Sequence, residues 1–379
     1  MAIRKKTLAI FTLVEHKQVD NHFYGYGPYI REMNIWVKNF DNILIVAPFT
    51  ESEELNAIDL PYEHPNINLV KVTSFNIKSF VNVLSLLIKL PVIMIKIFRV
   101  MQKSDHLHFR CPSNIAALAA IAQVFFPSKS KTVKYAGNWS PDSRQPFGYR
   151  FQKWLLSNSF FTKNNKILVY GKWDNQSKYV VPFYTATFSE LDKIDFSKRE
   201  YSKKLKFIFL GALVKGKRPF LVIKIIEELI EKGINLELHM FGDGILEVEL
   251  KNYISNNSLK DHIVLHGNKS MDIVKAYIKD SHFSILPSKS EGWPKALAEG
   301  MFYGVIPIST NVSCISWMLD NGNRGILIEP NQSRAAKVII DELEKGNTYL
   351  NAMSQQAQKW SEGFTIERFQ GDIKTILES

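Results

Sequence analysis

Short runs of apolar, β-type residues alternate along this chain with longer segments of helical periodicity, and this alternation restricts the fold more than any other feature. In the second half, the runs Leu205–Leu210, Leu236–Phe241, Ile263–Leu265 and Phe283–Pro287 are each followed by a turn, and helical segments recur between them, as at Phe220–Lys232. This pace predicts a parallel, doubly wound α/β sheet. Such sheets bind ligands at the carboxyl ends of their strands.

The first half of the chain repeats the rhythm, with expected strands at Thr7–Val14, Ile43–Ala47, Asn68–Val72, His106–Phe109, Thr132–Tyr135 and Lys166–Val169. A length of 379 residues fits two domains of ordinary size. The charged, non-periodic stretch Thr187–Lys204 is the expected linker between them. We therefore predict one domain over residues 1–187, a second over 200–362, and a final helical segment within 363–379.

A turn and a helix start follow the expected strand Phe283–Pro287. Pro294 suits the first helical position because it has no N–H to leave unsatisfied, and the helix is expected to run to Tyr303 and stop at Gly304. Free backbone amides and the positive end of the helix dipole make such a helix start an anion site. Glu291 in the turn and Glu299 in the helix add carboxylates that accept hydrogen bonds from hydroxyls. The combination fits a sugar nucleotide.

This segment resembles the donor-site signature of the family 4 retaining glycosyltransferases, which have the GT-B fold. The matching residues are Pro287-Ser288 with Glu291-Gly292, then Glu299-Gly300-Met301, then Gly304–Ile308. The resemblance implies an α/β architecture of two Rossmann-like, doubly wound domains that face each other across a cleft. It also implies that the N-terminal domain binds the acceptor, that the C-terminal domain binds the donor, and that the last helix packs back on the N-terminal domain.

The same resemblance implies roles for individual residues. Glu299 would bind the ribose hydroxyls and Glu291 those of the transferred sugar, while the amides of Gly292–Lys295 would hold sugar and phosphates. The expected donor-binding residues of the second domain are Ser290, Gly292, Trp293, Pro294, Lys295 and Glu299, together with the turn glycines Gly211, Gly242 and Gly267.

The loop Gly211–Pro219 resembles the family's basic segment that holds the donor diphosphate. Lys217 keeps the lysine position, but Ala212 stands where the family has an arginine. We expect Lys217, with Arg218, to neutralise the departing diphosphate, and Arg218 or Lys215 to supply the charge missing at Ala212. The alternative is a solvated basic helix start, which the helix dipole disfavours.

Two N-terminal segments also resemble family sites. A glycine-rich loop with Gly25 and Gly27 would let the backbone approach donor phosphate and acceptor; a simple turn is the alternative. His106 and His108 should point the same way, because alternate residues of a strand share a face. His108 is the expected contact to the transferred sugar, with a structural histidine as the alternative.

Further residues are expected to line the acceptor side of the cleft. Arg110 follows His108 in the same strand, and Asn138 comes just after the strand that ends at Tyr135. The sequence has no Asp-x-Asp run and no histidine–carboxylate cluster with metal spacing, so no divalent metal and no other cofactor is expected. Cys111 and Cys314 lie in different halves, which suits a reducing cytoplasm.

The predicted function is retaining transfer of a sugar from a UDP- or GDP-sugar to a glycan or lipid-linked acceptor, in capsule, exopolysaccharide or lipopolysaccharide synthesis. A nucleotide-sugar epimerase or phosphorylase of the same fold stays open, as does a non-catalytic sugar-nucleotide-binding subunit. Met1–Lys6 leads straight into the first strand, so we expect no targeting signal. The expected location is the cytoplasm, either free or peripheral on the inner face of the cell membrane.

Charge is unevenly divided between the two halves. Residues 1–187 hold 23 Lys and Arg against 12 Asp and Glu, whereas residues 188–379 hold 25 of each, so the net charge of +11 belongs to the first half. A basic acceptor domain predicts an anionic surface as partner, such as a lipid diphosphate at a membrane. Nucleic acid is not expected, because no nucleic-acid-binding motif occurs.

The apolar segment Phe75–Lys103 adds to the membrane hypothesis. Its longest uncharged run, Ser79–Ile88, is too short to span a bilayer. Five cations fall within an arc of roughly 80° on a helical projection, opposite an apolar stripe, which is typical of a helix in the headgroup plane. The cations are Lys78, Lys89, Lys96, Arg99 and Lys103, and the stripe is Leu84, Leu87, Val92, Ile93 and Ile97. Pro91 is expected to kink this helix or to start a second one, which disturbs the phase of the stripe. The alternative is a pair of ordinary helices that cover the sheet, with their lysines in water.

Overall fold

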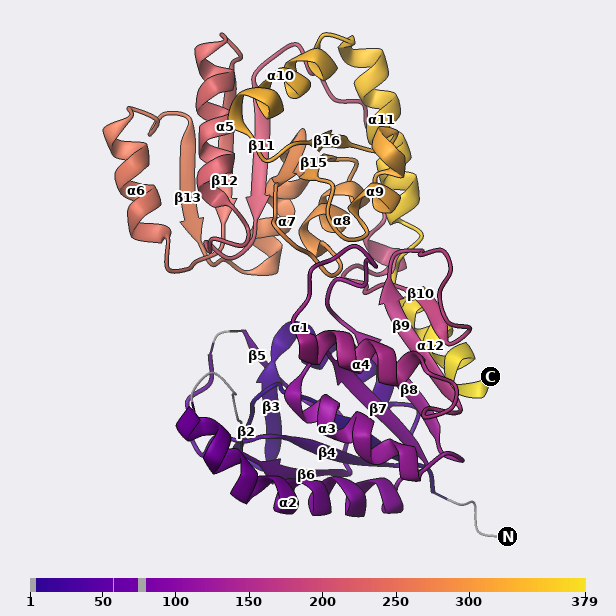
Figure 1. Ribbon diagram of the computed structural model, residues 1–379. Coiled ribbons are helices and arrows are strands. Elements are labelled where there is room, and N and C mark those ends of the chain that lie inside the picture. Colours follow the sequence, from indigo (N-terminus) through magenta and orange to yellow (C-terminus); the bar gives the residue numbers. More distant parts are fainter. Residues whose placement is uncertain (1–4, 57, 74–79) are drawn as a thin grey trace. The chain divides into compact units, whose positions relative to one another are not determined.

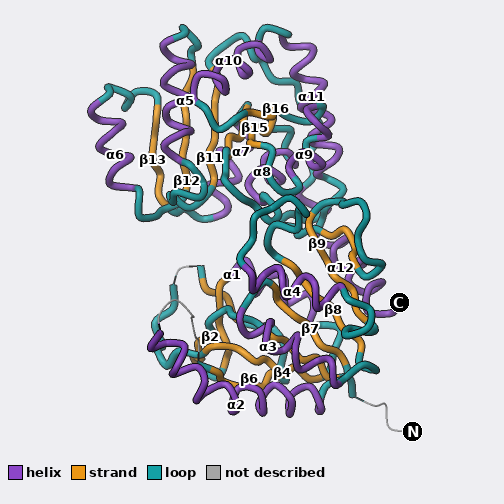
Figure 2. Tube along the Cα trace, viewed as in Figure 1, coloured by secondary structure: helices purple, strands orange, loops and turns teal. Residues whose placement is uncertain are grey.

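The computed structural model describes residues 5–56, 58–73 and 80–379 (Figure 1). The chain divides into two compact units. The first comprises Met1–Phe183 and Gln370–Ser379, and the second comprises Tyr184–Phe369. Figure 2 shows strands and helices alternating in both. Each unit is built on its own parallel sheet.

The first unit has a seven-stranded parallel sheet in the order β10-β9-β8-β7-β1-β4-β6. Its strands are β1 (Thr7–Phe11), β4 (Asn42–Pro48), β6 (Ile67–Val72), β7 (His106–Cys111), β8 (Ser130–Tyr135), β9 (Asn165–Tyr170) and β10 (Val180–Phe183). The six strands predicted for this half are confirmed, with shifted ends; β10 was not predicted. A second sheet, antiparallel, was also not predicted and comprises β2 (His16–Val19), β3 (His22–Tyr26) and β5 (Asp59–Pro61).

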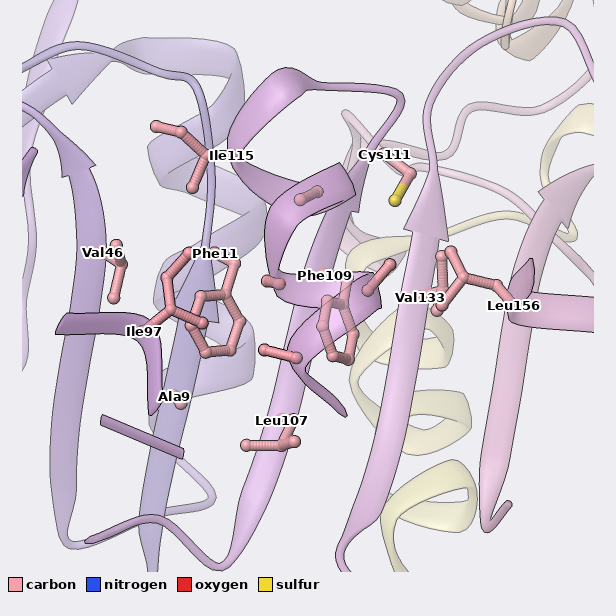
Figure 3. Close-up of a cluster of buried hydrophobic side chains, with 14 of the residues drawn as sticks. Ala9, Phe11, Val46, Ile97, Leu107, Phe109, Cys111, Ile115, Val133 and Leu156 are labelled. Atoms are coloured by element: carbon pink, nitrogen blue, oxygen red, sulfur yellow. The ribbon is translucent and has the colours of Figure 1, made fainter. Parts of the chain in front are cut away.

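Side chains of β7 alternate between the two faces of this sheet. Leu107, Phe109 and Cys111 enter a buried cluster covered by α2, α3 and α4 (Figure 3), whereas His108 packs on Trp36 of α1. The helices of this unit are α1 (Gly27–Val37), α2 (Phe80–Lys103), α3 (Asn114–Ala122) with the 3₁₀ turn η1 (Gln123–Phe125), α4 (Phe147–Ser157) and most of α12 (Ile366–Glu378).

The helix α2 continues through Pro91, so of the two outcomes predicted for this proline, a kink or a second helix start, the second start is wrong. Ile93 and Ile97 are buried in the cluster under the helix. These two residues therefore cover the sheet, as the alternative interpretation of the apolar stripe held. Lys78 lies outside the described residues, as do the side chains of Leu84 and Leu87. Within the described part of the chain, no helix is both long and apolar enough to cross a membrane.

The second unit has a six-stranded parallel sheet in the order β13-β12-β11-β14-β15-β16. Its strands are β11 (Leu205–Leu210), β12 (Leu236–Phe241), β13 (Ile263–Gly267), β14 (Phe283–Leu286), β15 (Ile306–Thr310) and β16 (Ile326–Ile328). Its helices are α5 (Pro219–Glu231), α6 (Glu247–Asn256), α7 (Met271–Asp280), α8 (Lys295–Phe302), α9 (Ile315–Met318), α10 (Gln332–Leu343) and α11 (Gly346–Ser361), with 3₁₀ turns η2 (Glu190–Asp192) and η3 (Asp320–Gly322).

The stretch predicted as the linker is part of the second unit. Phe188 is buried, and the guanidinium of Arg199 donates hydrogen bonds to the carbonyls of Tyr303 and Gly304 at 2.6 and 2.7 Å. These carbonyls lie at the end of α8, where a helix leaves acceptors unsatisfied. Polar side chains such as Arg199 hold this stretch on the second unit, and they give it no apolar periodicity. The chain passes from the first unit to the second between Phe183 and Tyr184 and returns to the first between Phe369 and Gln370.

Helix α8 is one residue shorter than predicted at each end, whereas the predicted stop at Gly304 is confirmed. Gly304 has φ +70°, the left-handed conformation expected just after a helix, and follows the C-cap Tyr303. Pro294 is the N-cap and not the first helical residue, because its ψ is 78°. The helix thus begins at Lys295, one residue later than predicted.

Candidate functional site

The chain reverses its direction of growth across the second sheet between β11 and β14. From β11 it adds β12 and β13 on one side; from β14 it adds β15 and β16 on the other. Loops leave the two central strands in opposite directions at such a switch point, and the gap between them is where open α/β sheets bind ligands. The loops concerned are residues 211–218 after β11 and 287–294 after β14.

A lysine and a glutamate from these two loops meet at the switch point. Lys217 Nζ lies 2.5 Å from Glu291 Oε1, with the Glu291 side chain 6% exposed and that of Lys217 30% exposed. The amide of Lys289 also donates to the carbonyl of Gly216 at 2.8 Å, which ties the loops together. The structure thus brings together two residues that the sequence predicts for the same site.

Arg218 links the same two loops. Its Nη1 donates to the carbonyls of Pro287 and Ser288 at 3.0 and 3.1 Å, and its backbone lies in the left-handed region, with φ +53°. Burial lowers the pKa of this guanidinium from its usual value. Arg218 therefore has a bridging role that the sequence did not reveal. Its substitution for the arginine missing at Ala212 remains a prediction, and Lys215 lies exposed on the same loop.

Three of the predicted glycines line the carboxyl edge of the sheet. The amide of Gly211 donates to the carbonyl of Phe241, and the amide of Gly242 donates to the carbonyl of Gly267, both at 3.0 Å. A β-carbon on Gly242 would lie 2.2 Å from the carbonyl oxygen of Gly211, and φ of Gly242 is +121°. A side chain is therefore excluded at this position.

The turn before α8 offers donors to an anion. Within the described part of the chain, the amides of Ser290, Glu291 and Gly292 donate to no protein acceptor. The positive end of the α8 dipole lies just beyond them. The turn is anchored from α9's side by the hydroxyl of Ser313 and the thiol of Cys314, which donate to the carbonyl of Gly292. Burial raises the pKa of Cys314 to about 12, so the thiol keeps its proton.

Glu299 is held by a residue that sequence reasoning missed. Thr187 Oγ1 donates to Glu299 Oε1 at 2.9 Å, and both residues line a small cavity together with Trp293. Thr187 stood in the expected linker, where no local signal marks it. The side chain of Trp293 is buried against Trp360 and Phe364. The role expected of Trp293 in donor binding concerns its backbone amide, and it remains a prediction. The other two predicted residues, Pro294 and Lys295, are the N-cap and the first residue of α8 and follow Trp293 directly in the sequence.

The glycines predicted in a loop of the first unit lie in regular structure. Gly25 is in strand β3 and Gly27 opens α1, so the predicted glycine-rich loop is wrong. A β-carbon on Gly27 would lie 2.2 Å from the carbonyl oxygen of Ile58, and one on Gly25 would lie 3.2 Å from the side chain of Ile30. Close packing within this unit accounts for both glycines.

The histidines of β7 are core residues. His106 and His108 point the same way, as predicted, and both lie at hydrogen-bond distance, 2.8 and 2.9 Å, from the hydroxyl of Thr132. His108 is fully buried against Trp36, with ring centroids 4.6 Å apart. It therefore cannot touch a sugar, and its predicted catalytic role is wrong. Burial lowers the pKa of His106 to about 3 and that of His108 well below its usual value.

The two residues predicted for the acceptor side both make internal contacts. Arg110 lies near the end of β7, beside β1, where the first sheet has its own switch point. Its Nη1 is 3.3 Å from Glu32 Oε1, a buried carboxylate that the sequence did not single out. Asn138 Oδ1 accepts from the amide of Ser140 at 2.8 Å and so shapes the loop after β8. Contact with an acceptor remains a prediction for both.

Comparison with known proteins gives a match for the second unit. Residues 191–360, less than half of the chain, match the family model described as glycosyl transferases group 1. A relative from Methanocaldococcus jannaschii, an uncharacterised glycosyltransferase, is 29% identical over 45% of this chain and 47% of its own length. The UDP-Gal:alpha-D-GlcNAc-diphosphoundecaprenol alpha-1,3-galactosyltransferase of Escherichia coli is 29% identical over 46% of each chain. The chain thus spans about half the length of these curated relatives.

A likeness to solved structures extends over the whole chain. The Anabaena protein HepE, solved in complex with UDP and glucose, aligns over 99% of this chain and 100% of its own, with a TM-score of 0.68 and 14% identity. At this identity the likeness bears on the fold alone. Together with the two parallel sheets, it confirms the predicted GT-B fold class, in which each half is a Rossmann-like unit.

Proposed function

We propose that this protein is a retaining, metal-independent glycosyltransferase that moves a sugar from a UDP- or GDP-sugar to a glycan or lipid-linked acceptor in the synthesis of a surface polysaccharide. The observation that carries the proposal is the meeting of Lys217 and Glu291 at the switch point of the second sheet. A donor diphosphate requires a cation and amide donors, and the sugar beside it requires a hydroxyl acceptor. These groups lie on two adjoining loops.

Lys217 is the cation suited to the diphosphate. Its ammonium group is held by Glu291, and a diphosphate at this place would compete for it. The unbonded amides of Ser290, Glu291 and Gly292 supply further donors at the positive end of α8. As the bond between the sugar carbon and the diphosphate oxygen breaks, the electron pair stays on the diphosphate. Lys217 and these amides stabilise the charge that develops there.

Glu291 is the residue suited to bind the transferred sugar. Once a diphosphate shares Lys217, the carboxylate of Glu291 can accept hydrogen bonds from sugar hydroxyls. The new bond forms between an acceptor hydroxyl oxygen and the sugar carbon, and the hydroxyl proton passes to the departing diphosphate or to solvent. Protein cations take the part that a divalent metal plays in other transferases. Retention of configuration follows from the resemblance of the Glu291 and Glu299 spacing to retaining enzymes.

Glu299 is the candidate ligand of the ribose. It lies in α8, and Thr187 fixes the position of one carboxylate oxygen. Two similar proteins agree with a uridine nucleotide: the E. coli relative is named for a UDP-Gal donor, and HepE was solved with UDP. The E. coli relative acts on a diphosphoundecaprenol-linked sugar, which agrees with a lipid-linked acceptor.

The proposal is tested first by thermal unfolding with a panel of UDP- and GDP-sugars, since a ligand at 100 times its Kd stabilises the fold by about 2.7 kcal/mol. The donor that raises Tm is then incubated with lipid-linked acceptors, with and without EDTA, and the anomeric configuration of the product is read by NMR. We expect a glycosylated product with the configuration of the donor, and no loss of rate with EDTA. Glu299→Ala should weaken binding of the nucleoside diphosphate.

Other outcomes would contradict the proposal. A sugar nucleotide whose sugar is epimerised without acceptor would identify an epimerase, and a product that requires inorganic phosphate would identify a phosphorylase. Binding without any product over the acceptor panel would indicate a non-catalytic subunit. Inversion at the anomeric carbon, or a rate that EDTA abolishes, would refute the retaining or the metal-independent part.

A further inference from the structure

Helix α4 of the first unit has apolar residues on two faces. On the inner face, Leu155 and Leu156 are buried in the hydrophobic cluster that packs on the sheet. Leu156 is labelled in Figure 3. On the outer face, Phe147, Phe151 and Trp154 recur at i, i+4 and i+7, which places them along one side of the helix. Phe147 is 80% exposed and Trp154 53% exposed. Phe151 is partly buried against the same cluster, but packing on the sheet does not explain the exposed rings of Phe147 and Trp154.

The outer aromatic residues form a continuous patch. Phe147, Arg150, Phe151 and Trp154 line an open, almost wholly apolar hollow. The ring of Trp154 lies 5.6 Å from that of Phe161, which lies 5.0 Å from Phe160. Phe160 is 79% exposed. We call Phe147, Phe151, Trp154, Phe160 and Phe161 the aromatic face. Exposed apolar patches of this kind mark contact surfaces.

Cations surround the aromatic face. Arg144, Arg150 and Lys163 are exposed, and none of them has a carboxylate within ion-pair distance among the residues that the structure describes. The wider segment 80–170 holds 13 Lys and Arg but two carboxylates, Asp105 and Asp142. The difference of 11 equals the formal net charge of the whole chain. The charge asymmetry noted in the sequence is therefore concentrated in the part that forms α2, α3, α4 and the strands between them.

The neighbouring helices add exposed apolar residues to the same layer. α2, α3 and α4 cover one face of the sheet, with α3 in contact with both of the others (Figure 1). Exposed apolar side chains of the layer outside α4 are Val92, Ile95, Ile121 and Phe125. Lys89, Arg99 and Lys103 are exposed along α2. The layer thus combines apolar and cationic groups over three helices.

We propose that the outer surface of the α2–α3–α4 layer, centred on the aromatic face, binds the anionic surface of a lipid bilayer. Phe and Trp rings are favourable at the level of the headgroups, and Lys and Arg are attracted to anionic lipids. The unpaired cations around the aromatic face provide the complementary charge. The centre is α4 and not the apolar stripe of α2 that the sequence suggested, because Ile93 and Ile97 of that stripe are used in the core. This inference does not depend on the proposed transferase activity.

Vesicle flotation tests the proposal with the full chain. The probes are vesicles of phosphatidylcholine alone and of phosphatidylcholine with phosphatidylglycerol, at low and high salt. The apolar variant is Phe147→Ser, Trp154→Ser and Phe160→Ser; the charge variant is Arg144→Gln, Arg150→Gln and Lys163→Gln. The matched control replaces two exposed apolar residues of the second unit, Ile245→Ser and Val248→Ser, which are 79% and 70% exposed.

We expect the wild type and the control to float with anionic vesicles at low salt and to be released as salt rises. The charge variant should bind on the order of 100-fold more weakly, from about fivefold for each cation. The apolar variant should also lose binding while circular dichroism stays unchanged, since its residues are exposed. In addition, lipids with brominated acyl chains should quench tryptophan fluorescence in the wild type and quench it less in Trp154→Phe.

Several results would overturn the proposal. These are equal flotation of wild type and apolar variant, equal binding to neutral and anionic vesicles, or quenching that is unchanged in Trp154→Phe. A polyanion such as RNA is the competing partner for a basic, aromatic surface. An RNA oligonucleotide bound tightly by the wild type and lost in both variants, with no vesicle binding, would identify that partner instead.

Discussion

Thr187 and Glu299 are joined by a hydrogen bond, with Oγ1 of the threonine donating to Oε1 of the glutamate at 2.9 Å. The threonine lies just beyond the boundary between the two units, and the glutamate lies in the helix at the candidate donor site. A hydroxyl bound to one carboxylate oxygen restricts the rotamers of the glutamate. Thr187 is thus a positioning residue for the proposed ribose ligand.

Thr187→Val should therefore weaken donor binding more than it slows turnover. We expect the Kd of the nucleoside diphosphate to rise on the order of fivefold, which corresponds to about 1 kcal/mol for one hydrogen bond. Thr187→Ser keeps the hydroxyl and should bind like the wild type. Calorimetry with the ribose and the 2′-deoxyribose nucleotide makes the test specific. The valine variant should discriminate less between them, and unchanged discrimination would argue against the role.

Lys217→Ala should lower kcat by a factor on the order of 100, as expected when one preorganised contact to a developing charge is removed. The matched control is Lys224→Ala, an exposed lysine of α5 in the same unit, and its kcat should stay close to that of the wild type. Steady-state kinetics with the donor found by thermal screening would measure both. Equal losses in the two variants would show that the overall charge of the unit matters and that the contact of Lys217 with Glu291 does not.

Arg218→Ala should reduce stability more than turnover. The substitution removes hydrogen bonds to the carbonyls of Pro287 and Ser288, each worth about 1 kcal/mol. We expect a lower Tm, and a kcat reduced less than in Lys217→Ala. The opposite pattern, an unchanged Tm with a loss of kcat as large as that of Lys217→Ala, would show that Arg218 replaces the arginine missing at Ala212.

Gly242→Ala and Gly267→Ala separate crowding from backbone strain. Both glycines have positive φ, +121° and +67°, but a β-carbon at Gly242 would lie 2.2 Å from the oxygen of Gly211, whereas one at Gly267 meets nothing within 4 Å. Gly267→Ala should lower the free energy of unfolding by about 1–2 kcal/mol, the cost of the left-handed conformation. Gly242→Ala should cost several-fold more or prevent folding. Denaturant unfolding of the two variants would measure this, and equal losses would contradict it.

The first unit should lose stability as pH falls below the range of an unfolded histidine. Burial lowers the pKa of His16 to about 4 and that of His106 to about 3, whereas an unfolded histidine titrates near 6.5. Below that value the unfolded chain binds protons at these histidines, whereas the folded unit does not until the pH approaches their lowered pKa values. The stabilisation that the neutral, buried histidines give to the folded unit is therefore complete above about pH 6.5 and is lost as pH falls. The loss should be roughly 1.4 kcal/mol per pH unit for each histidine.

Urea unfolding between about pH 7.5 and about pH 5 would measure that slope, in a range above most carboxylate titration. His106→Gln should reduce the slope even if it also lowers stability. His22→Gln replaces an exposed histidine and should leave the slope unchanged. A slope that His106→Gln does not alter would show that this imidazole does not govern the acid sensitivity.

The second unit could be predicted from the sequence in most of its parts. Strands β11 and β12 have the predicted limits, and β14 ends one residue before the predicted run, because each is a largely apolar segment followed by a clear turn. Lys217 and Glu291 were assigned to one site from separate motifs, and the sheet order brings their loops together. Periodicity and turn residues are local properties, and they sufficed here because the site lies at strand ends.

The first unit was predicted less well, because its special residues act through contacts distant in sequence. A glycine is needed at position 27 because the carbonyl oxygen of Ile58 lies too close for a β-carbon, and His108 is buried because its ring packs on Trp36. The local sequence around Gly27 or His108 signals neither contact. The stretch after Thr187 lacks apolar periodicity, which is typical of a linker. In the structure it belongs to the second unit, where Arg199 anchors it through hydrogen bonds to carbonyls at the end of α8. Polar anchoring of this kind leaves no hydrophobic pattern to detect.

The close approach of Gly242 to Gly211 also bears on how this protein could be redesigned. The loops after β11 and β12 are in contact through their backbones. The amide of Leu213 donates to the carbonyl of Asp243 at 2.7 Å, and the amide of Leu246 donates to the carbonyl of Leu213. Neither loop can be exchanged alone, because the backbone of each loop packs against and hydrogen-bonds to the backbone of the other. A chimera with altered specificity would have to transplant both loops from the same parent, and libraries that randomise one of them would consist mostly of unfolded proteins.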